Sequence, residues 1–237
     1  MEFLIKEIKK FNYQDLLNLE QYDLQYQSLE SLFFFLKNKE QFLKLVIINS
    51  LLSYQLTMKW EKYWNCFSDY FKNWTIDIKK DFQGFLWKYN KRLLQAKLKR
   101  LDKIMLFMDS LNLKKLEYYK NYQKEFLENL AWAMNQKKDA KTVVFCIKMF
   151  IWWWKIIWEN IIVDKDIFIP LDNRLLKVSN NKQDWLKLSK ETWYSLLLLD
   201  TLFYISLWWD VDKIEGLELA KKVINFKKIL ENKFLSL

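Results

Sequence analysis

Glycine and proline are almost absent from this chain: among its 237 residues there are two glycines, Gly84 and Gly216, and one proline, Pro170. β-Hairpins and tight turns depend on glycine, proline and Asn-Gly pairs, so an all-β or doubly wound chain of this length needs many of them. The glycine-rich loops that bind nucleotide phosphates cannot be written with these residues either. The sequence therefore predicts a fold that is nearly all α-helix.

The chain has no histidine and two cysteines, Cys66 and Cys146. Without histidine, serine and cysteine triads, imidazole acid–base catalysis and histidine-ligated metal sites are excluded. Two thiols are too few for a four-thiolate zinc site or an iron–sulfur cluster, and they imply no disulfide framework. We therefore expect no metal, no cofactor and a reducing, intracellular setting. The reactive groups that remain are lysine amines and carboxylates.

The charge balance favours an acidic partner. Lys plus Arg number 39 and Asp plus Glu 29, a net charge of +10, which suits a nucleic acid or an anionic membrane. The longest apolar runs, residues 142–158 and 193–209, contain charges and are too short to span a bilayer. The N-terminus carries acidic residues within its apolar stretch, unlike a signal peptide. We expect a soluble, cytoplasmic protein.

No repeat and no linker divides the chain, so residues 1–237 are expected to form a single helical domain, whose length allows two lobes. Breaks between helices are expected at residues 73–80, 135–139, 163–170 and 179–184. The third is the clearest, because Pro170 excludes helical geometry at Ile169 and Asp172 is placed to cap a helix over residues 173–178.

Two further helices can be assigned from hydrophobic pattern. Residues 42–56 are apolar on nearly every side, which indicates a helix at the centre of the domain. In residues 94–108 the apolar side chains share one stripe, and Arg92, Lys99 and Lys103 lie on the opposite one. This basic face either contacts phosphates or is simply solvated.

The helix that follows Asp139 combines cations and rings. Asp139 is expected to cap this helix, which puts Lys141 in the first turn. At about 100° per residue, one stripe then alternates basic and aromatic side chains: Lys141, Phe145, Lys148, Trp152 and Lys155. Such a surface suits a nucleic acid, because cations bind phosphates while rings stack on bases. The alternative is a solvated helix face with two aromatic residues.

Lys141 has a second property. The positive end of the helix dipole and the nearby Lys137 and Lys138 disfavour its ammonium form. A neutral amine is the nucleophilic form of lysine, and partial burial would be needed in addition to reach it.

Two aspartates can also take part in chemistry. As a helix cap Asp172 stays ionised and can stabilise a developing cation, although capping alone would explain it. Asp200 lies alone in an apolar run and must face a partner or a pocket, with Tyr204 one turn later on the same face. A carboxylate and a ring together can hold a nucleobase. The alternative is a core aspartate satisfied by backbone or lysine.

Five segments of the chain, taken in order, resemble one known family. They are residues 23–26, 53–56 with 63–64, 141–149, 169–174 and 199–204. Together they resemble the archaeal GO glycosylases (AGOG), which are DNA glycosylase/lyases of the helix-hairpin-helix superfamily that remove 8-oxoguanine. The resemblance spans about residues 20–210, and its most specific part runs from Lys141 to Asp172.

The resemblance implies a two-lobed helical DNA glycosylase fold, with a variant helix-hairpin-helix and the active site between the lobes. It implies that Lys141 is the nucleophile and Asp172 the catalytic carboxylate. The residues implied in base recognition are Gln25, Trp64, Phe145, Lys148, Pro170, Asp200 and Tyr204. The reaction would proceed through a lysine Schiff base and β-elimination, without metal or cofactor.

Two departures from the family pattern bear on the site. The hairpin before Lys141 contains no glycine, so Lys137 and Lys138 would replace its backbone contacts to DNA phosphate. Tyr204 stands where tryptophan is expected, and Trp208 or Trp209 could stack on the base instead.

The expected partner is DNA that contains 8-oxoguanine, bound by a monomer at the nucleoid without membrane association. Three other functions stay open: a non-catalytic helical protein that binds nucleic acid, a glycosylase for another base lesion, and a glycosylase without lyase activity.

Overall fold

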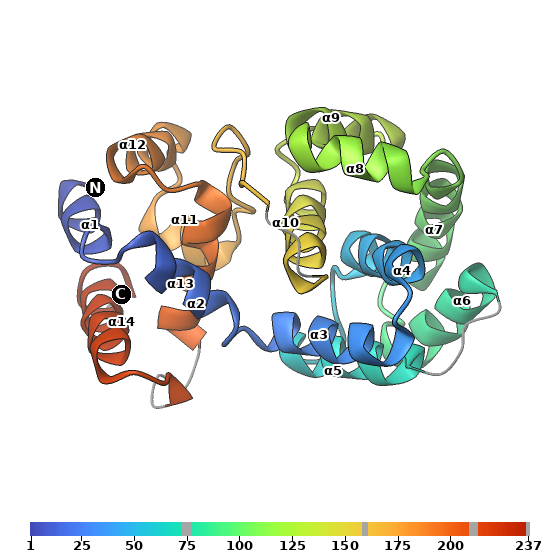
Figure 1. Cartoon of the computed structure of the whole chain (residues 1–237), viewed down its shortest axis with the longest axis horizontal. Coiled ribbons are helices and arrows are strands. Elements are labelled where there is room, and N and C mark those ends of the chain that lie inside the picture. The colour runs from blue at the N-terminus through green and yellow to red at the C-terminus, as the bar shows by residue number, and fades with distance from the viewer. Residues whose placement is uncertain (73–76, 158–160, 209–212, 236–237) are drawn as a thin grey trace. The chain divides into compact units, whose positions relative to one another are not determined.

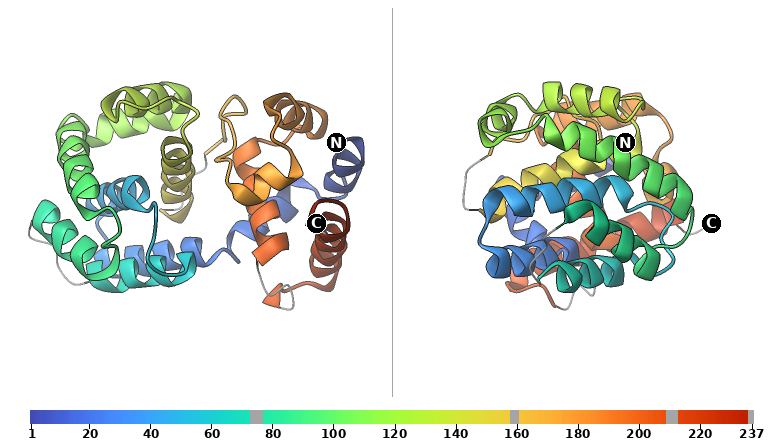
Figure 2. Two further views of the ribbon diagram at one scale, coloured as in Figure 1. Left: turned by 180° about the vertical axis from the view of Figure 1, so that it is seen from behind. Right: turned by 90° about the vertical axis from the view of Figure 1, so that its right-hand side faces the viewer.

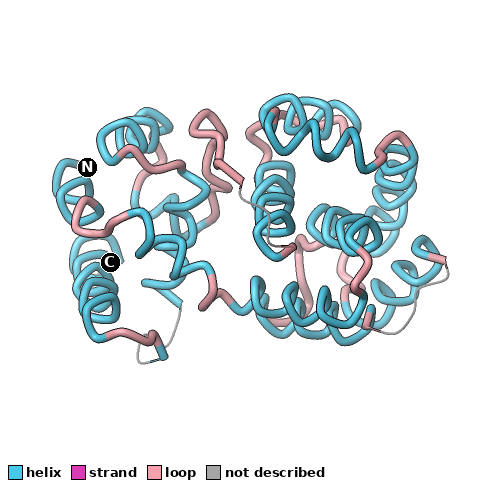
Figure 3. The backbone as a smooth tube through the Cα atoms, viewed as in Figure 1, coloured by secondary structure: helices cyan, strands magenta, loops and turns pink. Residues whose placement is uncertain are grey.

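In a computed structural model, residues 1–72, 77–157, 161–208 and 213–235 are described. All regular secondary structure in these ranges is helical, and Figure 3 shows helices joined by loops with no strand among them. The expected all-α class is confirmed. Among the helices of these ranges, none is both long and apolar enough to cross a membrane.

The chain folds into two compact units. Unit 1 combines Met1–Asp23 with Val163–Leu237, and unit 2 is the continuous stretch Leu24–Ile162. Both chain ends therefore belong to unit 1. The expectation that the two units are lobes of one domain stays a prediction.

Unit 2 is built around two helices. Its elements are α3 (Leu24–Leu36), α4 (Lys39–Leu52), α5 (Trp60–Phe71), α6 (Ile78–Tyr89), α7 (Leu94–Asp109), α8 (Leu113–Asn121), α9 (Gln123–Ala133) and α10 (Lys141–Ile156). Helix α10 packs against α4, α9 and α3, and α4 also packs against α7 (Figure 1). The two further views again show α4 and α10 side by side (Figure 2). Because both helices are surrounded, their side chains are apolar on nearly every face.

Unit 1 has its own apolar core. Its elements are α1 (Glu2–Ile8), α2 (Tyr13–Glu20), α11 (Asn173–Val178), α12 (Lys182–Thr192), α13 (Leu196–Trp208), α14 (Leu217–Leu230) and a π-helical turn (Glu231–Leu235). Helix α13 packs against α2, α12 and α14. The buried side chains of this core include Trp185, Phe203 and Phe226.

Asparagine and aspartate mark the helix starts in a chain with so little glycine and proline. Side chains cap α2, α4, α6, α8, α11 and α12 through Asn12, Asn38, Asp77, Asn112, Asp172 and Asn181. Each accepts a bond from a backbone N–H that the helix leaves unpaired. Left-handed backbone positions fall on residues other than glycine, among them Gln55 at φ 48° and Asn135 at φ 51°.

These caps correct several expected boundaries. The predicted break at residues 163–170 and the helix over 173–178 are confirmed. The central helix predicted over 42–56 ends at Leu52, because the backbone of Ser53 leaves helical geometry. The loop predicted at 73–80 ends at Asp77, with 73–76 outside the described residues, and the loop predicted at 179–184 ends at Asn181.

Helix α7 confirms the predicted amphipathic surface helix. Arg92, just before it, and Lys99 and Lys103 within it are exposed, while Leu101 and Met108 are buried. The pattern did not show that Lys97 and Arg100 turn away from this basic face. Lys97 is fully buried, and Arg100 reaches into unit 2.

Candidate active site

The start of α10 places Lys141, although not as the sequence predicted. The N-cap is Ala140, without a side-chain bond, so the expectation that Asp139 caps this helix is wrong. The carbonyl of Ala140 accepts the N–H groups of Val143 and Val144, which starts the helix one residue later. Lys141 still lies in the first turn, but it is exposed, so the partial burial that a neutral amine would need is not found.

The hairpin before Lys141 forms without glycine. Asn135 adopts the left-handed conformation, with φ 51°, directly after α9. The N–H of Gln136 bonds to the carbonyl of Ala131 at 2.9 Å, and that of Asn135 bonds to Trp132 at 3.0 Å. These two bonds form a Schellman motif, in which asparagine is the usual substitute for glycine. Asn135 therefore fills the place of the missing glycine.

Both lysines of the hairpin, Lys137 and Lys138, are exposed, as contacts to phosphate require. The ammonium of Lys138 lies 2.7 Å from a carboxylate oxygen of Glu128. This bond lowers the pKa of Glu128. Because an exposed ion pair is weak, a phosphate can compete for Lys138.

The predicted stripe of cations and rings on α10 is not an exposed surface. Lys148 is 4% exposed and Trp152 is fully buried, while Phe145 is 8% exposed. The Lys148 ammonium lies 4.6 Å from the centre of the Trp152 ring. Packing of α10 against α3, α4 and α9 explains the burial. The nucleic-acid surface predicted here is therefore wrong, and so is its alternative, a solvated face.

Two other predicted base-binding residues of unit 2 are buried. Trp64 lies on α5 with its ring centre 6.0 Å from that of Phe145. Its indole N–H is buried and has no hydrogen-bond partner in the described part of the chain. Gln25 lies on α3 and is 4% exposed.

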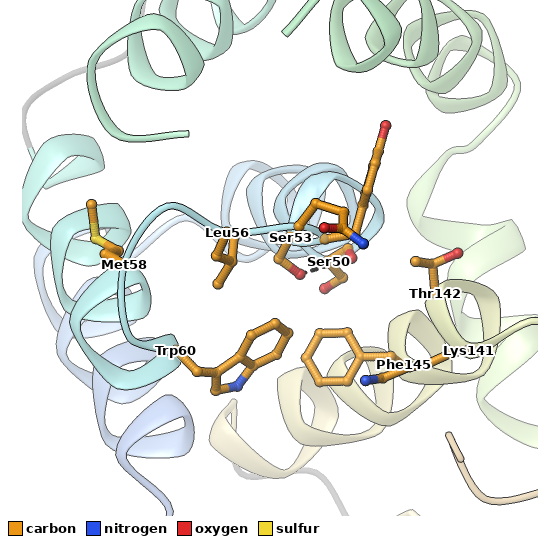
Figure 4. Close-up of a pocket in the computed structure, with 10 residues that line it drawn as sticks. Ser50, Ser53, Leu56, Met58, Trp60, Lys141, Thr142 and Phe145 are labelled. Atoms are coloured by element: carbon orange, nitrogen blue, oxygen red, sulfur yellow. Dashed lines mark hydrogen bonds between the residues drawn. The ribbon is translucent and has the colours of Figure 1, made fainter. Parts of the chain in front are cut away.

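A pocket of about 370 Å³ adjoins Lys141 in unit 2 (Figure 4). Its lining comes from the end of α4, the segment that follows, and the starts of α5 and α10: Ser50, Ser53, Tyr54, Gln55, Leu56, Met58, Trp60, Lys141, Thr142 and Phe145. The rings of Trp60 and Phe145 meet edge to face at 5.2 Å. Lys141 and Phe145, both predicted from the sequence, therefore line one pocket.

Two serine hydroxyls of this pocket's lining can accept hydrogen bonds. The Ser50 hydroxyl donates to the carbonyl of Val46 at 2.5 Å, and that of Ser53 donates to the carbonyl of Ser50 at 3.0 Å. Each hydroxyl has one proton, so its free lone pairs accept. A flat ring with N–H groups suits aromatic walls and acceptors of this kind.

In unit 1 the catalytic candidate Asp172 caps α11, as predicted. Its Oδ1 accepts the N–H groups of Arg174 and Leu175 at 2.9 and 3.1 Å. Its Oδ2 accepts the Nε of Arg174 at 2.5 Å and also the Nη2 of the same guanidinium. Pro170, two residues earlier, is buried. Asp172 is thus held by both a helix end and a cation.

Arg174 connects the other predicted residues of unit 1, and sequence reasoning gave it no role. Its Cζ lies 5.2 Å from the centre of the Tyr204 ring. Burial lowers the pKa of Arg174, but the hydrogen bond and charge of Asp172, with Asp200 and Tyr204, raise it overall. Asp200 and Tyr204 are 7% and 8% exposed. Asp200 therefore faces a charged neighbourhood, as its place in an apolar run predicted.

The alternative stacking residues cannot be compared with Tyr204. Trp209 and the side chain of Trp208 lie outside the described residues. The candidates thus form two groups, Lys141 with Phe145 and Trp64 in unit 2, and Asp172 with Asp200 and Tyr204 in unit 1.

These features define a class of protein: an all-α enzyme that lacks histidine, with a lysine amine beside a pocket and a capped aspartate as its reactive groups. A family model described as AGOG, N-glycosylase/DNA lyase, matches residues 5–233. The chain belongs to this family of N-glycosylase/DNA lyases. The resemblance seen in the sequence, and the class of enzyme it implied, are confirmed.

Individual relatives agree. An N-glycosylase/DNA lyase of Nanoarchaeum equitans is 35% identical over 97% of this chain and 98% of its own. One of Methanococcus maripaludis is 36% identical over 78% of each chain. The fold matches a crystal structure of Pa-AGOG, an 8-oxoguanine DNA glycosylase from Pyrobaculum aerophilum complexed with 8-oxoguanosine. That match has a TM-score of 0.78 and 23% identity, and it covers 94% of this chain and 96% of the other.

Proposed function

We propose that this chain excises 8-oxoguanine from DNA and then cleaves the strand, with Lys141 as the nucleophile and Asp172 as the catalytic carboxylate. The observation that carries the proposal is the position of Lys141, exposed in the first turn of α10 beside a pocket that Phe145 also lines. Family membership over residues 5–233 supports the same reaction class.

The chemistry follows from a lysine amine and a carboxylate. The neutral amine of Lys141 attacks C1′ of the deoxyribose; the bond from C1′ to the base breaks, and the base leaves with its electron pair. Asp172 stabilises the positive charge that develops on the sugar. The sugar ring opens to an imine with Lys141, loss of a C2′ proton expels the 3′ phosphate, and water then hydrolyses the imine.

We assign recognition of the base to side chains that can hydrogen-bond to it or stack on it. The unpartnered N–H of Trp64 can donate to the base, and Asp200 can accept from it. Gln25, Lys148 and the backbone near Pro170 complete the set, and Phe145 and Tyr204 supply rings. Lys137 and Lys138 bind phosphate. We also propose that the chain acts as a monomer at the nucleoid, which size-exclusion chromatography and localisation would test.

Borohydride trapping tests the covalent step. Added during turnover of an 8-oxoguanine duplex, borohydride should reduce the imine to a stable protein–DNA adduct. Lys141→Gln should abolish that adduct. Lys148→Gln removes a second lysine of the same helix, two turns further on, and tests whether that lysine is the nucleophile instead. Adduct formation by Lys141→Gln, but not by Lys148→Gln, would assign the nucleophile to Lys148.

A panel of duplexes with different lesions tests the substrate. Faster excision of another base would favour a glycosylase of different lesion range. Base release without adduct or cleavage would favour a glycosylase without lyase activity. Absence of base release, adduct and cleavage would favour a helical protein that only binds nucleic acid.

A further inference from the structure

Arg100 is a cation of unit 2 to which the proposed chemistry gives no role. It lies on α7, and its Nη2 donates to Gln136 Oε1 at 2.7 Å and to Thr142 Oγ1 at 3.1 Å. Its Cζ lies 5.5 Å from the centre of the Tyr54 ring. One side chain therefore contacts the hairpin, the first turn of α10 and the segment after α4.

The contacts of Arg100 form a closed network. Thr142 Oγ1 also donates to Gln136 Oε1, at 3.1 Å. Gln136 lies in the hairpin directly after Asn135, and Thr142 directly follows Lys141. The network thus joins the two sides of the turn that presents Lys141.

The charge of Arg100 has no opposite charge nearby. No carboxylate in the described ranges forms an ion pair with it, and its Nε is buried without a hydrogen-bond partner. Burial lowers the pKa of its guanidinium, which still stays protonated in proteins. Because a partly buried cation without an ion-pair partner costs stability, an apolar side chain would serve better if packing were the only need.

We propose that Arg100 is a positioning residue, which holds Gln136 and Thr142 together and thereby fixes Lys141 for attack on the sugar. This inference rests on the role proposed above for Lys141. The hairpin has no glycine, so its geometry depends on Asn135 and on this network. A planar guanidinium holds two acceptors at fixed angles, which a lysine ammonium does not. A misplacement of about 1 Å at a reacting group can reduce a rate about 100-fold.

Lys97 provides a matched control. It lies one turn before Arg100 on α7, is fully buried, and its ammonium lies 5.0 Å from the centre of the same Tyr54 ring. Its hydrogen bonds go to Asn90 Oδ1 and to backbone carbonyls that include those of Arg92 and Gln55. None of them reaches the hairpin or α10. Lys97→Met therefore removes a buried cation beside Tyr54 but leaves the start of α10 in place.

Two measurements on the full-length chain test the proposal. The first is the single-turnover rate of borohydride trapping on an 8-oxoguanine duplex, with KM measured separately. Arg100→Met should lower that rate about 10- to 100-fold, with KM changed less than threefold. Arg100→Lys should recover little of it, and Lys97→Met should stay within threefold of the parent. The second is hydrogen exchange of amides 136–142, which should be faster in Arg100→Met but not in Lys97→Met.

If Arg100→Met does not fold, Thr142→Val removes one acceptor from the network with a smaller change. It should also slow trapping, and Thr142→Ser, which keeps the hydroxyl, should restore the rate. Trapping at the parental rate by Arg100→Met or by Thr142→Val would overturn the positioning role alone. A parent that forms no adduct, or an adduct that survives Lys141→Gln, would overturn the proposed function and this inference with it.

Discussion

Each unit holds a partly buried arginine, and the two units differ in what balances its charge. In unit 1 the Arg174 guanidinium donates to the carboxylate of Asp172, and the net effect of its surroundings is to raise its pKa. In unit 2 the Arg100 guanidinium donates to a neutral amide and a hydroxyl, and burial lowers its pKa. The same side chain is therefore an ion-pair partner in one unit and an unbalanced cation in the other.

The difference matters for each proposed reactive group. Asp172 is already neutralised by Arg174, so the positive charge that develops on the sugar must share that carboxylate with a cation. Near Lys141, Lys137 and Lys138 lie in the preceding hairpin, and Arg100 donates to Thr142. These cations favour the approach of DNA phosphates. Unit 1 thus supplies a balanced carboxylate, and unit 2 an amine among cations.

The largest effect is expected from removing the carboxylate of unit 1. Asp172→Asn keeps a side chain that can cap α11 but leaves Arg174 without its counter-charge. The free energy of unfolding should fall by about 3 kcal/mol, near the lower end for a broken buried pair, because the Arg174 side chain is 24% exposed. Base release should be lost while DNA binding persists. Urea denaturation and an excision assay measure the two effects.

The double variant Asp172→Asn with Arg174→Leu is the control for this prediction. It removes both charges, so most of the lost stability should return while excision stays absent. A single variant as stable as the parent would show that the ion pair does not balance Arg174.

How far the sequence could predict these features depends on how local they are. Pro170 and Asp172 act on their own neighbours, so the break and the start of α11 were predictable. The sequence could not show that Ala140, rather than Asp139, is the N-cap. A polar side chain is the stronger capping signal in a sequence, but here the backbone of Ala140 begins the helix. The scarcity of glycine and proline was enough for the fold class.

Features that depend on distant packing could not be predicted in the same way. Lys148 and Trp152 share a stripe with Lys141, but the pattern of one helix does not reveal that α3, α4 and α9 surround it. One signal was present for Arg100. It precedes Ile104 by four residues, and that spacing places it on the buried stripe of α7 rather than on the basic face.

The next largest effect is expected on DNA binding, from removing one aromatic ring in each unit. Phe145→Ala and Tyr204→Ala should each weaken binding of an 8-oxoguanine duplex by about 1–3 kcal/mol if both rings stack on the base. Arg174 covers one face of Tyr204 at 5.2 Å, so only the other face can take a base. The readout is the difference in affinity between damaged and undamaged duplexes, which cancels a general loss of stability.

Tyr204→Phe keeps the ring and is the control for the second variant. Equal excision by Phe145→Ala and the parent would remove Phe145 from the site. A silent Tyr204→Ala would direct attention to Trp208 and Trp209.

The smallest expected effect is that of pH on stability through Lys97, a buried cation of unit 2. Burial, with a contribution from Arg92, lowers the pKa of Lys97 from 10.5 to about 8. Between these values the unfolded chain binds more protons than the folded one, so the free energy of unfolding should rise with pH. Burial also raises the pKa of Tyr63, and a bond to Glu125 raises the pKa of Tyr118 to about 12. Burial raises the pKa of the Cys146 thiol as well. Thiol ionisation in the unfolded chain therefore offsets the rise from about pH 9, and tyrosine ionisation reverses it near pH 10.

Denaturation at pH 7.5, 8, 8.5 and 9 measures this rise, which should be about 1.4 kcal/mol per pH unit at most. Lys97→Met should flatten it, because the group that gains the proton on unfolding is gone. Arg100→Met should leave the slope as in the parent, since a guanidinium does not titrate in this range. An equal slope in the parent and in Lys97→Met would show that Lys97 is not the group responsible. Lys97 and Arg100 would then contribute alike to the pH dependence of stability, although their hydrogen bonds differ.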